Sequence, residues 1–153
     1  MLLLFIKRFI RPLAWIILKQ QIRRQFPTVQ QLSTKTLANW LENSEPKLQL
    51  IDTRNQEEFL VSHLPNAKHI PDLETAKSNL DPNVTIVAYC SVGYRSSRLA
   101  EQLQQLGYPQ VWNLEGSIFK WANEGRILKQ NGKPTQNVHP YSKSWQWLLN
   151  NHG

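Results

Sequence analysis

The fold of this chain is decided by one stretch, Val84-Thr-Ile-Val-Ala-Tyr-Cys-Ser-Val-Gly-Tyr-Arg-Ser-Ser-Arg98. Val84–Tyr89 is almost wholly apolar and rich in β-branched side chains, which predicts a central strand of a parallel sheet, buried on both faces. Leucines then recur at helical spacing through Arg95–Leu106 and a glycine follows, so a helix is predicted to end there. A strand, a tight loop and a helix in this order are the repeating unit of α/β proteins.

The flanking sequence repeats this alternation in both directions. Strands are predicted at Val29–Leu32, Leu48–Asp52, Ala67–Ile70 and Val111–Leu114, and helices at Thr36–Glu42, Gln56–Leu64, Leu73–Leu80 and Ser117–Asn123. Strands that alternate with helices predict an open α/β domain with a mainly parallel sheet. After Ile127 the sequence is polar and turn-rich until Trp145–Leu149, where a last helix is expected to pack back on the domain.

Composition and charge divide the chain into three parts. It has 153 residues, of which 41% are hydrophobic and 19% charged, as expected for one globular domain. Of the net charge of +7, six basic residues and no acidic residue lie in residues 1–26, so twelve basic and eleven acidic residues, a balance of +1, remain. The positive charge therefore belongs to an N-terminal segment, and no nucleic acid is expected as a partner. We expect residues 27–127 to form the folded domain and residues 128–153 an extension that packs on it.

The N-terminal segment, residues 1–26, has the pattern of a surface-bound helix. At about 100° per residue, one side collects Ile6, Phe9, Ile10, Leu13, Ile16 and Ile17, and the other collects Lys7, Arg8, Arg11 and Lys19. Its uncharged runs are too short for a membrane span, and no small-residue cleavage site follows. The pattern favours a basic amphipathic helix, kinked or restarted at Pro12, on an anionic membrane surface. The protein is then expected to be cytoplasmic and peripheral on the membrane.

Two other interpretations of residues 1–26 stay open. The helix can instead cover an apolar patch of its own domain, or the segment can be a poorly cleaved targeting sequence.

Cys90 is the only cysteine of the chain. An intramolecular disulfide and a zinc site of several thiolates are therefore excluded, and a single cysteine suits a reducing compartment. His63, His69 and His139 are too scattered to suggest a metal site. From composition alone a lone cysteine is more often a buried filler than a reactive thiol, so the residues around it decide.

The loop after the central strand favours a reactive thiol. It consists of Cys90, Ser91, Val92, Gly93, Tyr94, Arg95 and Ser96. Gly93 allows the backbone to curl so that N–H groups point at one anion, and the start of the next helix adds positive charge there. These features favour the thiolate and make Cys90 a candidate nucleophile. Arg95 is predicted either to bind an anion or to pair with a neighbouring carboxylate, and capping is the expected role of the Ser91 and Ser96 hydroxyls.

Three ordered motifs carry a resemblance to a known family. Cys90-x-x-Gly93-x-Arg95-Ser96 resembles the active-site loop of the single-domain rhodaneses. The family's first signature is similar to Ile51–Arg54, Glu58-Phe59, His63–Ala67 and His69–Pro71, and its closing signature is similar to Asn113–Ile118 with Trp121 and Gly125. Together the motifs cover roughly Val29 to Arg126 in the right order. Asn66 stands where the family usually has Gly, and Asn tolerates the left-handed turn that is expected there.

The resemblance implies a rhodanese-like fold, an open, mainly parallel five-stranded sheet flanked by helices on both faces. It also implies that Cys90 takes a sulfane sulfur from a donor such as thiosulfate, carries it as a persulfide and passes it to a thiol or to cyanide. No metal or organic cofactor is implied. The residues from Ser91 to Ser96 would hold the anion, while Asp52 and Arg54 would brace the site.

Two further expectations concern the substrate. The classical two-domain enzymes carry further charge near the cysteine, whereas Ser91 and Val92 are neutral, which weakens thiosulfate as the preferred donor. The walls of the pocket are expected to come from loops such as Asp72–Leu80.

Two other functions stay open. Cysteine phosphatases and arsenate reductases of related fold need a loop one residue longer, with Arg at the position where this chain has Ser96. A rhodanese-like domain can also serve as a non-catalytic binding or regulatory module, here at a membrane surface, although such modules have usually lost the cysteine.

Overall fold

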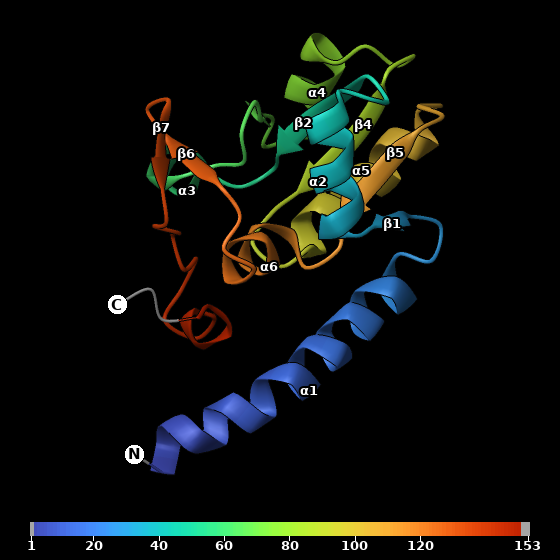
Figure 1. Ribbon diagram of the computed structural model, residues 1–153. Coiled ribbons are helices and arrows are strands. Elements are labelled where there is room, and N and C mark those ends of the chain that lie inside the picture. The colour runs from blue at the N-terminus through green and yellow to red at the C-terminus, as the bar shows by residue number, and fades with distance from the viewer. Residues whose placement is uncertain (1, 151–153) are drawn as a thin grey trace.

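The computed structural model describes residues 2–150 and is built around a five-stranded sheet (Figure 1). In spatial order the strands are β1 (Gln30–Leu32), β5 (Val111–Leu114), β4 (Thr85–Tyr89), β2 (Leu48–Asp52) and β3 (Lys68–His69). All four pairings are parallel. The central strand β4 is buried along its whole length, as its almost wholly apolar sequence predicts. The α/β fold predicted from the sequence is confirmed.

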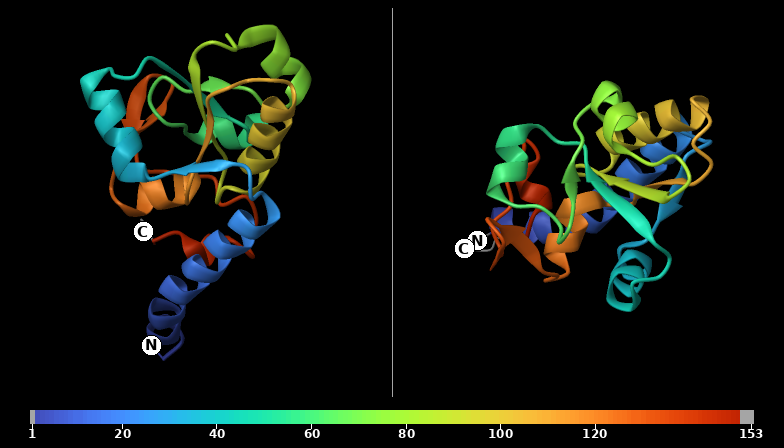
Figure 2. Two further views of the ribbon diagram at one scale, coloured as in Figure 1. Left: turned by 90° about the vertical axis from the view of Figure 1, so that its right-hand side faces the viewer. Right: turned by 90° about the horizontal axis from the view of Figure 1, so that it is seen from above.

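Helices cover both faces of this sheet (Figures 1 and 2). They are α2 (Thr34–Asn43) and α6 (Ser117–Asn123) on one face, and α4 (Leu73–Asn79) and α5 (Tyr94–Gln105) on the other. Val87 and Tyr89 of β4 pack in the cluster with α2 and α6, whereas Ile86 and Ala88 pack in the cluster with α4 and α5. Successive side chains of a strand point to opposite faces, so one apolar strand serves both clusters.

A short helix and a turn connect β2 to β3. The helix is α3 (Gln56–Val61), and the turn that follows contains Asn66. The φ of Asn66 is 63°, which is the left-handed conformation expected for the residue that stands in place of Gly.

The C-terminal extension differs from the prediction. Residues expected to be irregular form a hairpin of β6 (Leu128–Gln130) and β7 (Lys133–Thr135). Asn131 and Gly132 form its turn with φ values of 49° and 75°, the combination that a type I′ turn requires. The Asn-Gly pair is the sequence signal for this hairpin, since its short polar strands show no apolar alternation. The helix expected at Trp145–Leu149 is a single 3-10 turn, η1 (Gln146–Leu148).

The first element, α1 (Leu2–Gln25), is one helix along the lower side of the molecule in Figure 1. It continues through Pro12, so the restart predicted there is wrong. Its C-terminal half packs on the domain through Leu18 and the buried Ile22, and the helix lies beside η1 (Figure 2). Over residues 2–150, no helix combines the length and the hydropathy that crossing a membrane requires.

Candidate active site around Cys90

Cys90 directly follows the central strand β4, at the edge of the sheet where α/β proteins place their sites. Its side chain is almost completely buried. The Gly93 N–H donates to the Cys90 Sγ, with the nitrogen 3.1 Å from the sulfur. Gly93 has a φ of 117°, and a Cβ at this position would lie 3.2 Å from the Asn113 Nδ2. Both the conformation and the space therefore require glycine where the loop turns its amide toward the sulfur.

The start of α6 holds the loop from the neighbouring strand. The N–H groups of Ile118 and Phe119 donate to the carbonyl oxygens of Cys90 and Ser91, both at 3.1 Å. The Cys90 N–H donates to the Ser117 Oγ at 3.2 Å. Because the first amides of a helix have no partner within that helix, they are available to bind these carbonyls. The shape of the loop thus depends largely on backbone groups.

The Ser96 hydroxyl is the second polar group at the sulfur. Its Oγ lies 3.4 Å from the Cys90 Sγ and 2.6 Å from the Asn113 Oδ1. A hydroxyl has a single proton, so Ser96 can donate to one of these acceptors at a time. The Asn113 amide is held by the hydrogen bond from its Nδ2 to the Gln31 Oε1 at 2.7 Å. The capping role predicted for Ser96 is wrong, because the N-cap of α5 is Gly93 and no side chain caps this helix.

Arg95 pairs with a carboxylate, which is one of the two roles predicted for it. Its Nη1 and Nη2 donate to the two carboxylate oxygens of Glu58 at 2.8 and 2.9 Å. Nη2 also donates to the Ser91 Oγ at 3.0 Å, and that hydroxyl lies 3.1 Å from the Glu58 Oε1. Ser91 is therefore part of this cluster and not a helix cap.

Glu58 carries no predicted role. Its sequence signal is Asn55-x-x-Glu58, which forms the capping box of α3 and so indicates only the start of a helix. Burial alone would raise the pKa of Glu58, but the hydrogen bonds and the charge of Arg95 lower it. Burial alone would lower the pKa of Arg95, but its hydrogen bonds to Glu58 and the negative charges of Cys90 and Glu58 raise it. Both partners are thus charged near neutral pH, and Glu58 balances the positive charge beside the sulfur.

Asp52 and Arg54 form a second ion pair that is completely buried. The Arg54 Nε and Nη2 donate to Asp52 at 2.9 and 2.7 Å, and Nη2 also donates to the Ser62 carbonyl at 2.6 Å. Burial would lower the pKa of Arg54, but the hydrogen bonds and the charge of Asp52 raise it. Asp52 ends β2 opposite Tyr89 of β4. The pair lies next to the Cys90 loop, and no hydrogen bond within residues 2–150 joins the two.

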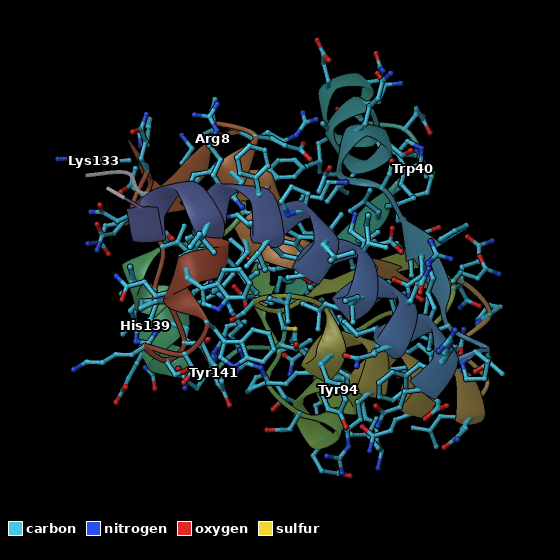
Figure 3. The ribbon with its side chains drawn as sticks, turned by 90° about the horizontal axis from the view of Figure 1, so that it is seen from below. Arg8, Trp40, Tyr94, Lys133, His139 and Tyr141 are labelled. Carbon is cyan, nitrogen blue, oxygen red and sulfur yellow. The ribbon has the colours of Figure 1, made fainter. Side chains whose placement is uncertain are left out.

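A cavity of about 720 Å³ opens over Cys90. Segments far apart in the sequence form its walls: Leu18, Ile22 and Arg24 come from α1, Val92, Tyr94 and Arg95 from the loop and α5, and Tyr141 and Trp145 from the C-terminal extension. Figure 3 shows Tyr94 and Tyr141 on the same side of α1. No residue of 72–80 lines the cavity, so the walls predicted there are wrong. The structure brings together no cluster of three or more His, Cys, Asp or Glu able to hold a metal among the residues it describes.

The chain belongs to the rhodanese-like domain family, whose model matches residues 33–124, more than half of its length. It is 31% identical over 99 residues to a sulfurtransferase of Allochromatium vinosum, which covers 63% of this chain and 92% of that protein. It is 33% identical to a rhodanese-like domain protein of Staphylococcus aureus of known crystal structure, with a TM-score of 0.57 over 67% of this chain and 99% of that one. The predicted resemblance is confirmed.

A relative of a different kind is the tRNA uridine(34) hydroxylase of Cronobacter sakazakii. The two are 31% identical over 103 residues, which is 61% of this chain but only 28% of the hydroxylase. The chain therefore spans about a quarter of that protein's length.

Proposed function

We propose that this protein is a sulfurtransferase that carries a sulfane sulfur as a persulfide on Cys90. The main support is the position of the Cys90 Sγ at the cavity, with the Gly93 N–H at 3.1 Å and the Ser96 Oγ at 3.4 Å. Donors placed in this way stabilise negative charge on a sulfur that is otherwise removed from water. A sulfurtransferase among the relatives further supports this function.

The reaction consists of two displacements at sulfur, as in thiol–disulfide exchange. In the first, the Cys90 thiolate attacks the outer sulfur of the donor. The bond between the donor's two sulfur atoms breaks, and its electron pair leaves with the inner sulfur, as sulfite from thiosulfate, as a sulfinate from a thiosulfonate or as a thiolate from an organic persulfide. In the second, a thiolate or cyanide attacks the outer sulfur of the persulfide, and Cys90 leaves as a thiolate. Neither step needs a metal or an organic cofactor.

The cavity favours an organic donor over thiosulfate. The charge of Arg95 is balanced by Glu58, so it attracts a small dianion less than a free guanidinium does. A volume of about 720 Å³ lies in the range of pockets that enclose drug-sized molecules, and much of its lining is apolar, including Leu18, Ile22 and Trp145. For each donor, kcat/KM is divided by the rate constant of its uncatalysed reaction with cyanide. We therefore expect this ratio to be higher for benzenethiosulfonate than for thiosulfate. Equal ratios for the two donors would contradict this donor preference but would not contradict the proposed persulfide on Cys90.

Mass spectrometry of the intact chain tests the persulfide. After treatment with either donor, the protein should gain one sulfur atom that dithiothreitol removes, and Cys90→Ser should gain none. The reductant is needed because a sulfinic acid adds nearly the same mass but resists reduction. Failure to take up sulfur from any donor would contradict the proposal and favour a non-catalytic module.

The Arg95–Glu58 pair also argues against a phosphatase. In that chemistry an arginine must be available to hold a tetrahedral oxyanion, whereas both terminal nitrogens of Arg95 are bonded to Glu58. Hydrolysis of an aryl phosphate is therefore expected to be absent from a preparation that transfers sulfur.

A further inference from the structure

One side of α1 is apolar and exposed. We call this the outer face of α1; it consists of Ile6, Phe9, Ile10, Leu13, Ile16 and Ile17, whose side chains are 45–77% exposed. Phe9 is the most exposed of them. Contiguous apolar surface of this kind is rare on a soluble protein unless something covers it.

The outer face cannot be buried by rotating the helix, because the opposite side is already fixed to the domain. Leu18 and Ile22 pack against the core clusters from that side. Lys19 and Arg23 form ion pairs with Glu115, and the Arg11 Nη1 is bonded to Asn150 at the other end of the chain. The structure thus realises one predicted alternative, since α1 covers its own domain, but it does so with the side that was expected to face water.

Charge indicates what covers the outer face. Residues 1–26 contain six basic residues and no acidic residue, while the rest of the chain is nearly balanced. Among these, Arg23 and Arg24 are exposed and, at about 100° per residue, lie next to or within the outer face, whereas the exposed Arg8 lies on the opposite side of the helix. An apolar helix face beside cations is complementary to a bilayer surface with anionic headgroups, which attract lysine and arginine side chains within a Debye length.

We propose that the outer face of α1 docks on the surface of an anionic membrane. The helix lies in the plane of the headgroups, with Phe9 and Leu13 at the depth of the acyl boundary. Arg24, which is among the residues that line the Cys90 cavity, follows on the same helix, whereas Leu18 and Ile22 line that cavity from the side opposite the outer face.

The test is co-sedimentation of the full chain with vesicles of phosphatidylcholine alone and of phosphatidylcholine with phosphatidylglycerol. Binding is expected only with the anionic vesicles and should decrease as salt is raised. The variant Phe9→Gln/Leu13→Gln should lower the partition coefficient by at least about tenfold. The matched control is Leu60→Gln/Ile127→Gln, which makes the same change at residues 57% and 61% exposed elsewhere on the surface, and it should bind like the original chain.

Three results of the vesicle assay would overturn the proposal. They are no binding to anionic vesicles, equal binding to both kinds of vesicle, and equal loss in both variants. A fourth is a dimer in sedimentation equilibrium without lipid that Phe9→Gln/Leu13→Gln abolishes, since a second copy would then cover the outer face. Circular dichroism spectra that match the spectrum of the original chain show that each variant is folded. Persulfide formation on Cys90 is measured in a separate assay, so that a failure of membrane binding and a failure of the proposed function can be distinguished.

Discussion

Two carboxylate–guanidinium pairs lie near the carboxyl edge of the sheet, and they differ in what surrounds them. Both side chains of the Asp52–Arg54 pair are 0% exposed, and Arg54 also holds the Ser62 carbonyl. In the Glu58–Arg95 pair Glu58 is buried, but Arg95 is 31% exposed and lines the cavity. The same kind of ion pair therefore joins parts of the buried scaffold in the first case and holds the Cys90 loop to α3 in the second. Stability should respond most to the first, and sulfur transfer to the second.

Breaking the buried pair is expected to have the largest effect. Arg54→Met leaves the Asp52 carboxylate buried without its partner, which should lower the free energy of unfolding by about 3–5 kcal/mol. Denaturation in urea, followed by tryptophan fluorescence, measures this loss. The matched control is Lys77→Met, which breaks the exposed pair with Glu74 and should cost less than about 1 kcal/mol. Equal losses in the two variants would mean that Arg54 contributes no more than a surface cation.

Breaking the Glu58–Arg95 pair should lower the stability of the protein only moderately but should clearly slow persulfide formation. Arg95→Met leaves Glu58 its hydrogen bonds to Ser91 and Asn55, and the cavity admits water, so we expect a smaller loss of about 1–3 kcal/mol. The loop loses its tie to α3, and the rate of persulfide formation should fall roughly tenfold, which equals about 1.4 kcal/mol in the barrier. Folded Arg54→Met, assayed at low temperature, should keep its rate. A slow Arg54→Met together with a fast Arg95→Met would reverse the roles given to the two pairs.

The sequence predicts the part of the site that is formed by consecutive segments of the chain. The central strand, the loop with Gly93 and the helix after it are consecutive, so spacing and residue type are enough to place Cys90 at the edge of the sheet. The sequence leaves two roles open for Arg95, because the choice between an anion and a carboxylate depends on α3, which lies more than thirty residues away in the chain. That choice is made by tertiary packing and leaves no local signal.

The same limit applies to the walls of the cavity. Ile22 and Tyr141 are far apart in the sequence and meet only because α1 and the C-terminal extension pack along the same side of the domain. The periodicity of α1 identified its apolar outer face. Leu18 and Ile22 lie on the opposite side together with basic residues, so the pattern gave no sign that this side packs on the domain. The hairpin of β6 and β7 was not predicted, although Asn131-Gly132 is a local sequence signal for its turn.

Acid should weaken the Glu58–Arg95 pair. Arg95 lowers the pKa of Glu58 below its ordinary value of 4.5, so the stabilisation is present above that value and is lost as the pH falls through the lower pKa of the folded protein. Glu58→Gln should cost about 1–2 kcal/mol at pH 7, and the difference from the original chain should shrink below about pH 4.5. Urea denaturation at a series of pH values measures this difference. Glu74→Gln, at an exposed carboxylate, is the control and should give a curve parallel to that of the original chain.

The smallest expected effect concerns the aromatic ring over Arg95. The guanidinium carbon lies 4.7 Å from the centroid of the Tyr141 ring, and this tyrosine is 49% exposed. A cation–π contact at an exposed site is worth about 0.5–1 kcal/mol, so Tyr141→Leu should lower the free energy of unfolding by that amount and Tyr141→Phe should not. In the Arg95→Met background the effect of Tyr141→Leu should disappear. An equal loss in both backgrounds would show that the ring packs against the C-terminal extension alone and gives the Glu58–Arg95 pair no support.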